Sequence, residues 1–268
     1  VAQKGNSRAA FLAAELRQQL RAEGVSVAVD TATAEALDFD GTPVEAFDAR
    51  DLVVSIGGDG TFLYAARAAG GTPMVGVNLG EVGFLNAVRP ENAVDAGRET
   101  VAARRESSHE IREASRLAAT CGGFESAAAV NEIVVSGPRR GHGGGATFEV
   151  TVDGSTYSTG HADGVLIATQ TGSTAYNLSE DGPLVHHSVN GLVVNEMSGI
   201  DPMPPLVVND DATVTVSARE ADHAVVVSDG RQPHEIELPA EITVGRTEPP
   251  VRLAGPVADF FEALGKLS

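Results

Sequence analysis

The feature that most constrains the fold is a compact apolar run, Leu52–Ile56, which a series of glycines ends abruptly. A short run of this kind is typical of a strand that is buried on both faces of a parallel sheet. Gly57-Gly58-Asp59-Gly60 follows directly, and Thr61 then opens an alanine-rich segment that predicts a helix. These three pieces predict a βα unit of an open α/β sheet, and the carboxyl edge of such a sheet is where anionic ligands bind.

The rest of the first half of the chain repeats this alternation of helix and strand. Ser7 can cap a helix with apolar residues at helical spacing, and Gly24 can end it in the left-handed conformation that suits glycine. Strands are predicted at Val25–Val29 and Pro73–Val77, with a short helix after Thr31 between them. This half is therefore predicted to be a Rossmann-like parallel α/β domain, built from stacked βαβ units.

From about residue 109 the apolar residues alternate along short strands that glycine-rich turns separate. Asp153-Gly154 is a hairpin signal, because both residues adopt positive φ readily. This half is predicted to be mostly β, so the fold class is α/β plus β. The tail returns to a helical pattern, and the apolar stripe within Val257–Leu267 could pack on either half.

Charge limits the class of partner. The chain has 37 Asp and Glu residues against 19 Lys and Arg, which gives a formal net charge of −18. A protein this acidic is not expected to bind nucleic acid in general. With Lys4 and Lys266 as the only lysines, the excess of carboxylates favours a high-salt cytoplasm in which counterions screen self-repulsion. An ordinary acidic protein is the alternative.

The single cysteine, Cys121, cannot form an internal disulfide, which favours a reducing compartment. No apolar run approaches the length of a membrane span and no leader sequence opens the chain, so we expect a cytoplasmic protein without a membrane partner. Val1 falls partway into the first strand that the alternating pattern needs, which predicts that a few residues precede it.

The glycine-rich turn at residues 57–60 suits anions, because glycines let backbone N–H groups approach phosphate and the helix dipole adds to them. It lacks the Gly-Lys-Ser/Thr ending of a Walker loop and the spacing of a dinucleotide fingerprint. Asp59 is unusual there, because a carboxylate among phosphates is unfavourable unless it accepts a hydroxyl proton or holds a metal ion. The alternative is that Asp59 caps the following helix.

A second cluster of small and hydroxyl-bearing residues follows the strand predicted at Asp163–Thr169. Four serine and threonine residues lie within Thr171–Ser179, at the expected junction of that strand with a helix. A helix cap would need only one hydroxyl, whereas several hydroxyls and a close backbone approach suit a polar ligand. This pattern predicts a second binding segment.

In order and spacing, these motifs resemble the NAD kinase family over nearly the whole chain. The segments that carry the resemblance are Gly57–Thr61 (GGDGT), Gly76–Gly80, Gly83–Leu85, Asn131-Glu132, Asp163-Gly164, Thr171–Tyr176 (TGSTAY) and Ser228–Gly230. GGDGT alone is shared with diacylglycerol and sphingosine kinases and, loosely, with phosphofructokinases, so it indicates only phosphoryl transfer. TGSTAY and the upstream Asn-Glu pair are far more specific to NAD kinases.

The resemblance implies phosphorylation of the 2′-hydroxyl of the adenosine ribose of NAD to give NADP. Asp59 would be the general base. Asn131 and Glu132 would hold the ribose and adenine region, with Asp163 on the nicotinamide side. The other substrate- and nucleotide-binding positions that the resemblance implies are Gly58, Gly60, Thr61, Asn78, Phe84, His161, Thr171, Thr174, Ala175, Tyr176, Asn177 and Ser179.

The resemblance also implies ATP or polyphosphate as the phosphoryl donor, Mg²⁺ bound with that donor, and a homodimer or homotetramer. The family's closing helix resembles Asp259–Leu267, which assigns the tail to the first domain. The domains would then be residues 1–105 with 250–268, and residues 106–249 as the NAD-binding domain. The active site is expected in the cleft where the two domains face each other.

Three positions depart from the family pattern, in which basic residues are frequent. Tyr64, Glu81 and His161 stand there, and each removes a fixed positive charge that could meet phosphate. Arg139-Arg140, beside the glycines at 141–145, could compensate, and the alternative is a solvated hairpin end. The departures bear on donor binding more than on NAD binding.

Two other functions remain open. A lipid or sugar kinase would share only the GGDGT loop and would leave the TGSTAY segment without a role. A non-catalytic NAD(P)-binding sensor would keep the dinucleotide pocket and lose donor contacts, in keeping with the substitutions at Tyr64, Glu81 and His161. A sensor, however, has no need for Asp59.

Two further features are interpreted as structural. His186-His187 has no acidic or cysteine partner at ligand spacing, and neighbours in a strand point to opposite faces, so we expect surface or interface histidines there. Cys121 has no His or Asn nearby in the sequence and is expected to be a small core or near-surface thiol rather than a nucleophile.

Overall fold

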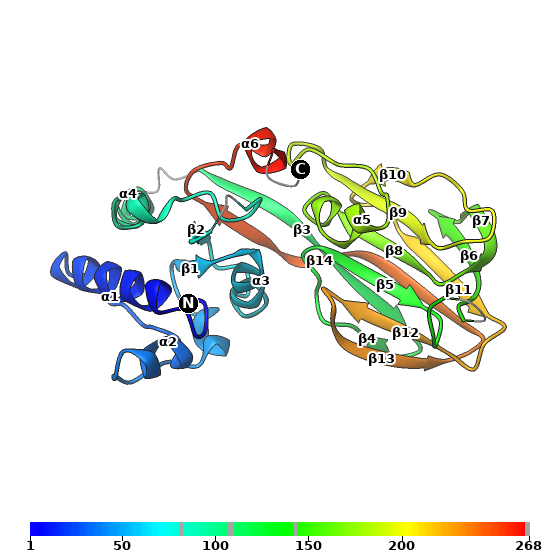
Figure 1. Ribbon diagram of the computed structural model, residues 1–268, viewed down its shortest axis with the longest axis horizontal. Coiled ribbons are helices and arrows are strands. Elements are labelled where there is room, and N and C mark those ends of the chain that lie inside the picture. Colours follow the sequence, from blue (N-terminus) through cyan, green and yellow to red (C-terminus); the bar gives the residue numbers. More distant parts are fainter. Residues whose placement is uncertain (81–82, 107–109, 142–143, 266–268) are drawn as a thin grey trace. The chain divides into compact units, whose positions relative to one another are not determined.

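The computed structural model of the chain describes residues 1–80, 83–106, 110–141 and 144–265. The chain divides into two units: unit 1 is Val1–Ala114 with Pro249–Ser268, and unit 2 is Ser115–Glu248. Figure 1 colours unit 1 from blue to green with its tail in red, and unit 2 from green to orange. Strands β3 (Ile111–Cys121) and β14 (Ala240–Ala254) contribute residues to both units.

Unit 1 contains a short parallel sheet with helices around it. Strands β1 (Val53–Gly57) and β2 (Met74–Asn78) run parallel, and Leu253 of β14 pairs in parallel with Met74 of β2. Its helices and 3₁₀ turns are α1 (Ser7–Ala22), α2 (Thr31–Ala36), η1 (Val44–Phe47), α3 (Asp59–Ala68), η2 (Pro90–Asn92), α4 (Ala93–Arg105) and α6 (Phe260–Leu264). The α/β character predicted for this half is confirmed.

The core of unit 1 forms where α1 packs on the sheet. Leu16 and Leu20 of α1 are buried together with Ile56 of β1 and Val77 of β2. The helix contributes residues four apart and the strands contribute residues from continuous apolar runs, which are the two patterns expected for these elements. Burying each of these side chains stabilises the unit by about 1.5–3 kcal/mol.

Helix α1 has the predicted extent but a different cap. Asn6, rather than Ser7, is the N-cap, because its side-chain oxygen accepts hydrogen bonds from the backbone N–H groups of Arg8 (3.1 Å) and Ala9 (3.3 Å). Asn and Ser serve equally well in this role, so composition alone does not choose between neighbours. Gly24 follows the helix at a φ of +75°, as predicted.

The strand predicted at Val25–Val29 is wrong, because this segment has no regular secondary structure. The edge of β1 is paired instead with the first residues of the chain. Ile56 donates its N–H to the Val1 carbonyl (2.8 Å), and Gln3 donates its N–H to the Ile56 carbonyl (2.8 Å). Alternating apolar residues form a strand only where a neighbouring strand has free backbone N–H and C=O groups. Here the edge of β1 already pairs with the first residues of the chain.

Unit 2 is built from antiparallel strands in two sheets. One sheet has the order β10-β9-β8-β5-β12-β13, and β14, β11, β6 and β7 are consecutive in the other, where β3 pairs with β14 and β4. The remaining bounds are β4 (Phe124–Glu125), β5 (Glu132–Ser136), β6 (Ala146–Val152), β7 (Ser155–Ala162), β8 (Gly164–Thr169), η3 (Gly172–Thr174), α5 (Tyr176–Ser179), β9 (Gly191–Met197), β10 (Leu206–Asn209), β11 (Val214–Arg219), β12 (His223–Ser228) and β13 (Arg231–Glu237).

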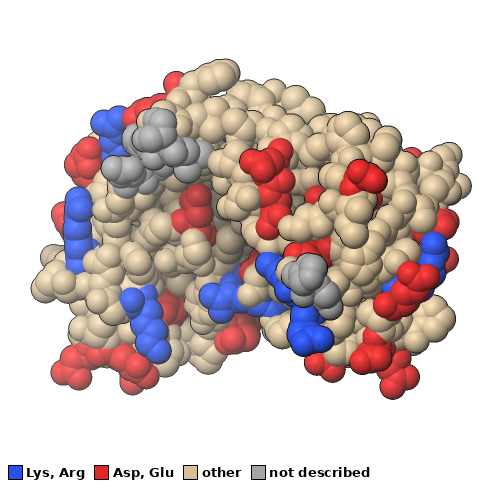
Figure 2. Space-filling view, turned by 45° about the vertical axis from the view of Figure 1, so that its right-hand side comes forward, with Lys and Arg blue, Asp and Glu red and all other residues tan. Residues whose placement is uncertain are grey.

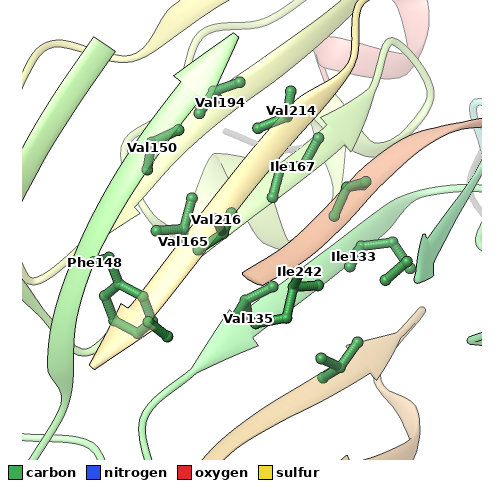
Figure 3. Packing of buried hydrophobic residues seen from close by; sticks show 14 of the residues in the cluster. Ile133, Val135, Phe148, Val150, Val165, Ile167, Val194, Val214, Val216 and Ile242 are labelled. Carbon is green, nitrogen blue, oxygen red and sulfur yellow. The ribbon is translucent and has the colours of Figure 1, made fainter. Parts of the chain in front are cut away.

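The core of unit 2 lies between its two sheets. Figure 3 shows Ile133 and Val135 of β5 among side chains from β6, β8, β9, β11 and β14. Alternate residues point inward, as Val214 and Val216 of β11 do, because successive side chains of a strand face opposite sides. The mostly-β character predicted for this half is confirmed.

The predicted hairpin at Asp153-Gly154 is confirmed as the turn between β6 and β7. Both residues have positive φ, +47° and +80°, which is the conformation that two-residue hairpin turns require. A Cβ at Gly154 would meet none of the described residues within 4 Å, so conformation rather than space favours glycine there. The Asp153 carboxylate also accepts a hydrogen bond from the Thr213 backbone N–H (2.9 Å).

The helical tail is shorter than the apolar stripe predicts. Only α6 is helical, and its Phe260 is buried and packs on Phe84 with ring centres 5.6 Å apart. Val257 and Phe261 are 53% and 74% exposed, so they do not share the buried face. Leu267 lies outside the described residues.

Carboxylates are scattered over the face of the molecule shown in Figure 2. On the face shown in Figure 2, Asp and Glu side chains are spread across the surface, and fewer Lys and Arg lie among them. Such a surface stays hydrated and is screened by counterions at high salt. Within the part of the chain that the structure describes, none of the helices has the length and apolar character needed to cross a bilayer.

Candidate active site

The turn between β1 and α3 presents backbone N–H groups at the carboxyl edge of the unit 1 sheet. A Cβ at Gly57 would lie 2.5 Å from the Thr61 hydroxyl, so glycine is needed for that contact. Helix α3 begins at Asp59 rather than at Thr61, with Gly58 as its N-cap and no side-chain cap. A Cβ at Gly58 or Gly60 would meet no atom of the described residues within 4 Å, so among these residues the helix start is open to an anionic group.

Asp59 directs its carboxylate into the segment 83–86 rather than onto the start of α3. The Asn86 side-chain amide donates to Oδ1 (3.0 Å), and the Phe84 backbone N–H donates to Oδ2 (3.3 Å). A Cβ at Gly83 would lie 2.3 Å from Oδ1, so glycine makes room for the carboxylate. Because no side chain caps α3, the alternative in which Asp59 is a helix cap is wrong.

Two effects act on the ionisation of Asp59. Burial raises the pKa of its carboxyl, and the hydrogen bonds from Phe84, Leu85 and Asn86 lower that pKa in part. A raised pKa makes this carboxylate a better proton acceptor than an exposed one, and its donors oppose its protonation.

Strand β2 ends beside this turn, since Asn78 lies opposite Gly57 in the register. The Asn78 side chain is buried and accepts a hydrogen bond from the Gly80 N–H (3.0 Å). Phe84 is half-buried, and its ring packs on Phe260 of α6. The structure therefore gathers the predicted residues of unit 1 at one sheet edge, and these are Gly58, Asp59, Gly60, Thr61, Asn78 and Phe84.

In unit 2, Asn131-Glu132 stands at the start of β5 and is fixed by Asp229. The Asp229 carboxylate accepts hydrogen bonds from the N–H groups of Val130 (3.0 Å), Asn131 (2.8 Å) and Glu132 (3.3 Å). Asp229 also donates its own N–H to the Glu132 carbonyl (3.1 Å). One carboxylate thus orders the backbone of both predicted binding residues.

Glu132 has the most perturbed acidity of the predicted site residues. Burial and the negative charge of Asp229 raise the pKa of Glu132 to about 7, and a hydrogen bond from the Tyr176 backbone N–H acts against that rise. Its Oε2 is buried without a hydrogen-bond partner among the described residues. Near neutral pH this carboxyl is divided between its acid form, which donates and accepts, and its acceptor-only carboxylate.

The TGSTAY segment packs directly on Asn131. A Cβ at Gly172 would lie 2.0 Å from the Asn131 carbonyl oxygen, so this glycine allows η3 to approach β5. Thr169 donates its N–H to that same carbonyl (2.9 Å) and its hydroxyl to the Val130 carbonyl (2.6 Å). The structure therefore brings Asn131, Glu132 and the start of the TGSTAY segment together.

Part of this segment satisfies its own backbone. The Ser173 hydroxyl donates to the Gln170 carbonyl (2.7 Å), and the Thr174 hydroxyl donates to the Thr171 carbonyl (3.2 Å). Asn177 is fully buried, and its amide donates to the carbonyls of Ser173 (3.3 Å) and Pro183 (3.0 Å). Thr171, Ala175 and Tyr176 are half-buried, and Ser179 is exposed, so these positions are accessible where Asn177 is not.

The segment that joins β5 to β6 contacts three predicted site residues. The Gly141 N–H donates to both oxygens of Asp163 (2.9 Å each), and His161 Nε2 bonds the Gly144 carbonyl (2.9 Å). Arg140 donates to the Tyr176 hydroxyl (2.5 Å), and its guanidinium lies 5.5 Å from the centre of that ring. His161, Asp163 and Tyr176 are therefore grouped around one short segment.

The three departures from the family pattern have different surroundings. Tyr64 on α3 is 44% exposed, and His161 is also exposed on β7. Glu81 lies outside the described residues. Arg140, one of the two arginines considered as a replacement, contacts a predicted site residue rather than solvent alone.

Three contacts with predicted site residues come from positions that sequence reasoning did not place in the site. Asn86 immediately follows the Gly83–Leu85 motif, and Asp229 is the centre of Ser228–Gly230, so both stood inside or beside recognised segments. For Arg140 the sequence leaves two interpretations, which are a replacement for the lost positive charges and a residue of a solvated hairpin end. Their roles depend on which backbone or side chain they contact in space, which spacing along the chain does not give.

His186 and His187 do not occupy a strand, so the expectation that they face opposite sides is wrong. Their rings are 4.1 Å apart and tilted by 32°, and the Ser188 hydroxyl lies 2.8 Å from His186 Nδ1. Among residues 1–80, 83–106, 110–141 and 144–265, no group of three or more His, Cys, Asp or Glu could hold a metal ion. Cys121 is half-buried and packs against the unit 2 core.

A cavity of about 570 Å³ lies in unit 1 between α1 and the segment 24–29. Its lining mixes apolar residues such as Leu16, Leu20 and Val54 with charged ones such as Arg17 and Asp51. None of the predicted site residues lines it. Its size does not make it the active site, because it contains none of the perturbed carboxyls.

Two family models match the chain. The ATP-NAD kinase N-terminal domain matches residues 1–104, and the ATP-NAD kinase C-terminal domain matches residues 130–254. These matches confirm the resemblance found from the GGDGT and TGSTAY segments.

Known relatives agree with the models. An NAD kinase of the haloarchaeon Halorubrum lacusprofundi is 56% identical and covers 100% of this chain and 98% of the relative, in keeping with the salt-adapted composition. Among solved structures, a yeast NADH kinase in complex with NADH has a TM-score of 0.84 at 21% identity, covering 100% of this chain and 85% of that one. An NAD kinase from Archaeoglobus fulgidus in complex with ATP has a TM-score of 0.73 at 25% identity, covering 95% and 92%. The chain belongs to the NAD kinase family of phosphotransferases.

Proposed function

We propose that the chain transfers the γ-phosphoryl group of ATP to the 2′-hydroxyl of the adenosine ribose of NAD, with Asp59 as the general base. The observation that carries this role is the placement of the Asp59 carboxylate, which is half-buried at the carboxyl edge of the unit 1 sheet and held by N–H donors. The ATP complex of the Archaeoglobus enzyme and the name of the Halorubrum relative support ATP and NAD as the substrates.

In this reaction the bond between ribose O2′ and the γ-phosphorus forms as the bond from that phosphorus to the leaving oxygen of ADP breaks. The hydroxyl proton passes to Asp59, which must be ionised beforehand. The N–H groups at the start of α3 have no side-chain cap and would meet the donor phosphates. Positioning and charge stabilisation therefore supply most of the catalysis.

Unit 2 is proposed to hold the dinucleotide. Asn131 and Glu132 would contact the ribose and adenine region, and Asp163 the nicotinamide side. Glu132 suits a hydroxyl ligand because its Oε2 has no partner among the described residues and its pKa is about 7, so it can donate as well as accept. Thr174, Ala175, Tyr176 and Ser179 would complete the contacts.

The divalent cation is proposed to arrive with the donor rather than to reside in the protein. In the described part of the chain no cluster of ligating side chains surrounds Asp59, whose two oxygens already accept hydrogen bonds from Phe84 and Asn86. Mg²⁺ is commonly held mainly by nucleotide phosphates and water, with few protein ligands. ATP and polyphosphate both present such phosphates, so both donors belong in the assay.

The working environment and assembly follow the same proposal. The net charge of −18 and the single cysteine support action in a reducing, salt-rich cytoplasm. Self-association as a homodimer or homotetramer is proposed from the family resemblance. Light scattering coupled to gel filtration in molar KCl measures it directly.

The test is NADP formation from NAD at molar KCl with Mg²⁺ and either ATP or polyphosphate. Wild type should form NADP, and Asp59→Asn should lower kcat by about 10²–10⁴ while NAD binding stays within a few-fold. Asp51→Asn is the matched control, because Asp51 is an exposed aspartate of the same unit just before β1.

Two outcomes would overturn the proposal in different ways. Tight NAD binding by wild type with no product from either donor would indicate the non-catalytic sensor. Full activity of Asp59→Asn would leave the kinase in place and remove the base assignment.

A further inference from the structure

Resting on the function proposed above, we propose that Asn86 is the positioning residue of the catalytic base: its side-chain amide holds the Asp59 carboxylate in one orientation and in its ionised form. In this role Asn86 contacts neither the phosphoryl donor nor the ribose hydroxyl, and it acts through Asp59 alone. The inference stands on three features of unit 1, which are the course of the segment 83–88, the burial and bonding of the amide, and the slot around the Asp59 carboxylate.

The first feature is how the backbone brings Asn86 to the site. The segment runs beside β2, where Val88 donates its N–H to the Gly76 carbonyl (3.0 Å) and Asn78 donates its N–H to the Val88 carbonyl (2.8 Å). A Cβ at Gly76 would lie 2.3 Å from the Asn86 side-chain oxygen and 2.8 Å from its Cα. The absence of a side chain at Gly76 therefore lets Asn86 pack on the β2 backbone.

The second feature is the state of the amide itself. Asn86 is fully buried, and its Oδ1 has no hydrogen-bond partner within the described residues. A buried polar atom without a partner is costly, so an apolar residue would be preferred here on packing grounds alone. The Asn86 side chain uses only its nitrogen in a hydrogen bond, and that nitrogen donates to Asp59 Oδ1 (3.0 Å).

The third feature is the slot that surrounds the carboxylate. Oδ1 lies against Gly83, where a Cβ would be 2.3 Å away, and Oδ2 accepts the longer bond from the Phe84 N–H (3.3 Å). The Asn86 amide is the only side chain that donates to this carboxylate in the described structure. Removing it would leave backbone N–H groups as the remaining donors and would favour the protonated acid, which cannot act as a base.

The experiment compares Asn86→Leu and Asn86→Asp with wild type across a pH series of kcat in molar KCl. Leucine keeps the side-chain volume and removes the donor, whereas aspartate keeps the shape and adds a negative charge beside Asp59. We expect the acidic limb of the profile to move to higher pH in both, so that kcat falls about ten-fold more at the acid end of the series than on the alkaline plateau, where the loss is no more than about three-fold.

Two controls separate positioning from a general structural effect. Asn92→Leu removes an exposed amide that makes no side-chain cap bond at the start of α4, and it should leave the profile unchanged. In the second control, Asn86→Leu is added to Asp59→Asn. Because Asn86 acts through Asp59, this double variant should lose no more activity than Asp59→Asn alone.

A direct titration keeps the inference independent of turnover. Carboxyl ¹³C NMR of aspartate-labelled protein, with Asp59→Asn to assign the resonance, should show Asp59 titrating at higher pH in Asn86→Leu than in wild type. An unmoved acidic limb together with an unmoved Asp59 titration in the folded variants would overturn the inference. A wild type that forms no NADP would instead overturn the proposed function, and the NMR titration would still decide the role of Asn86.

Discussion

Two carboxyls among the predicted site residues, the half-buried Asp59 in unit 1 and the buried Glu132 in unit 2, both have raised pKa values but have opposite kinds of neighbour. Asp59 is surrounded by donors, from the Asn86 amide and the backbone of residues 84–86. Glu132 faces the Asp229 carboxylate, whose charge adds to burial and brings the pKa to about 7. Burial alone therefore does not define a role. Donors keep one carboxyl available as a base, and a like charge keeps the other partly in its acid form.

Exchanging each carboxyl for its amide should separate the two roles most strongly. Asp59→Asn removes a proton acceptor and should lower kcat by about 10²–10⁴. Glu132→Gln keeps a donor and an acceptor, so it should lower kcat/KM by no more than about ten-fold, mainly through KM. Steady-state kinetics at pH 7 in molar KCl measures both. Equal losses of kcat in the two variants would show that the contrast drawn between the carboxyls is wrong.

The sequence predicts most of what the local backbone decides. The apolar run before the glycines locates β1, the residues Asp153-Gly154 locate a hairpin, and alternation identifies the mostly-β half. These features follow from side-chain periodicity and backbone conformation, both of which are local. The segment Val25–Val29 has the same kind of pattern and forms no strand, because strand formation depends on a distant neighbour with free backbone groups.

The site was predictable as motifs and not as contacts. The GGDGT segment indicates where a carboxylate stands, but its orientation toward segment 83–86 depends on Gly83, which leaves room for it. Asp229 shows the same limit: it is distant in sequence from the Asn131-Glu132 backbone that it orders. Hydrogen bonds between residues so far apart follow from topology, which spacing does not contain.

Removing Asp229 tests whether its carboxylate orders the backbone around Glu132 in unit 2. Asp229→Ala leaves the N–H groups of Val130, Asn131 and Glu132 without their acceptor, and it should lower the free energy of unfolding by about 2–3 kcal/mol. Losing the acceptor of three N–H groups would by itself cost more free energy of unfolding, but the variant also removes the repulsion between Asp229 and Glu132, which offsets part of that cost. Urea unfolding in molar KCl measures the change, and the exposed Asp211→Ala is the control. A change below about 0.5 kcal/mol would remove Asp229 from this role.

The acidity of Glu132 predicts a pH-dependent stability difference. The pKa of Glu132 is about 7 in the folded state, above its ordinary value of 4.5. The ionised carboxylate therefore destabilises the folded state above pH 7, and this destabilisation disappears as the pH falls toward 4.5. Glu132→Gln should therefore be more stable than wild type by about 2 kcal/mol at pH 8.5, with the difference shrinking steadily below pH 7. Denaturant unfolding at four pH values measures it.

The control for this titration is Glu125→Gln, because Glu125 is an exposed glutamate of β4 in the same unit. Its stability relative to wild type should not change over the same pH range. A Glu132→Gln difference that stayed constant between pH 5 and 8.5 would mean that Glu132 is ionised throughout, and the two carboxyls would then no longer differ in protonation.

The smallest expected effect concerns the positive charge at the edge of the unit 2 site. Both arginines are exposed, and Arg140 contacts Tyr176 through its hydrogen bond and the ring face. His161 lacks a permanent positive charge, and Arg140 could supply that charge instead. Arg140→Gln should then raise the KM for NAD about three-fold with kcat unchanged, and Arg139→Gln should not. Because an exposed charge is screened, the Arg140 effect should shrink as KCl increases from 0.5 to 3 M. Equal KM values for the two variants at every salt concentration would make the segment a solvated hairpin end, and recognition in unit 2 would then rest on its buried carboxyls and backbone.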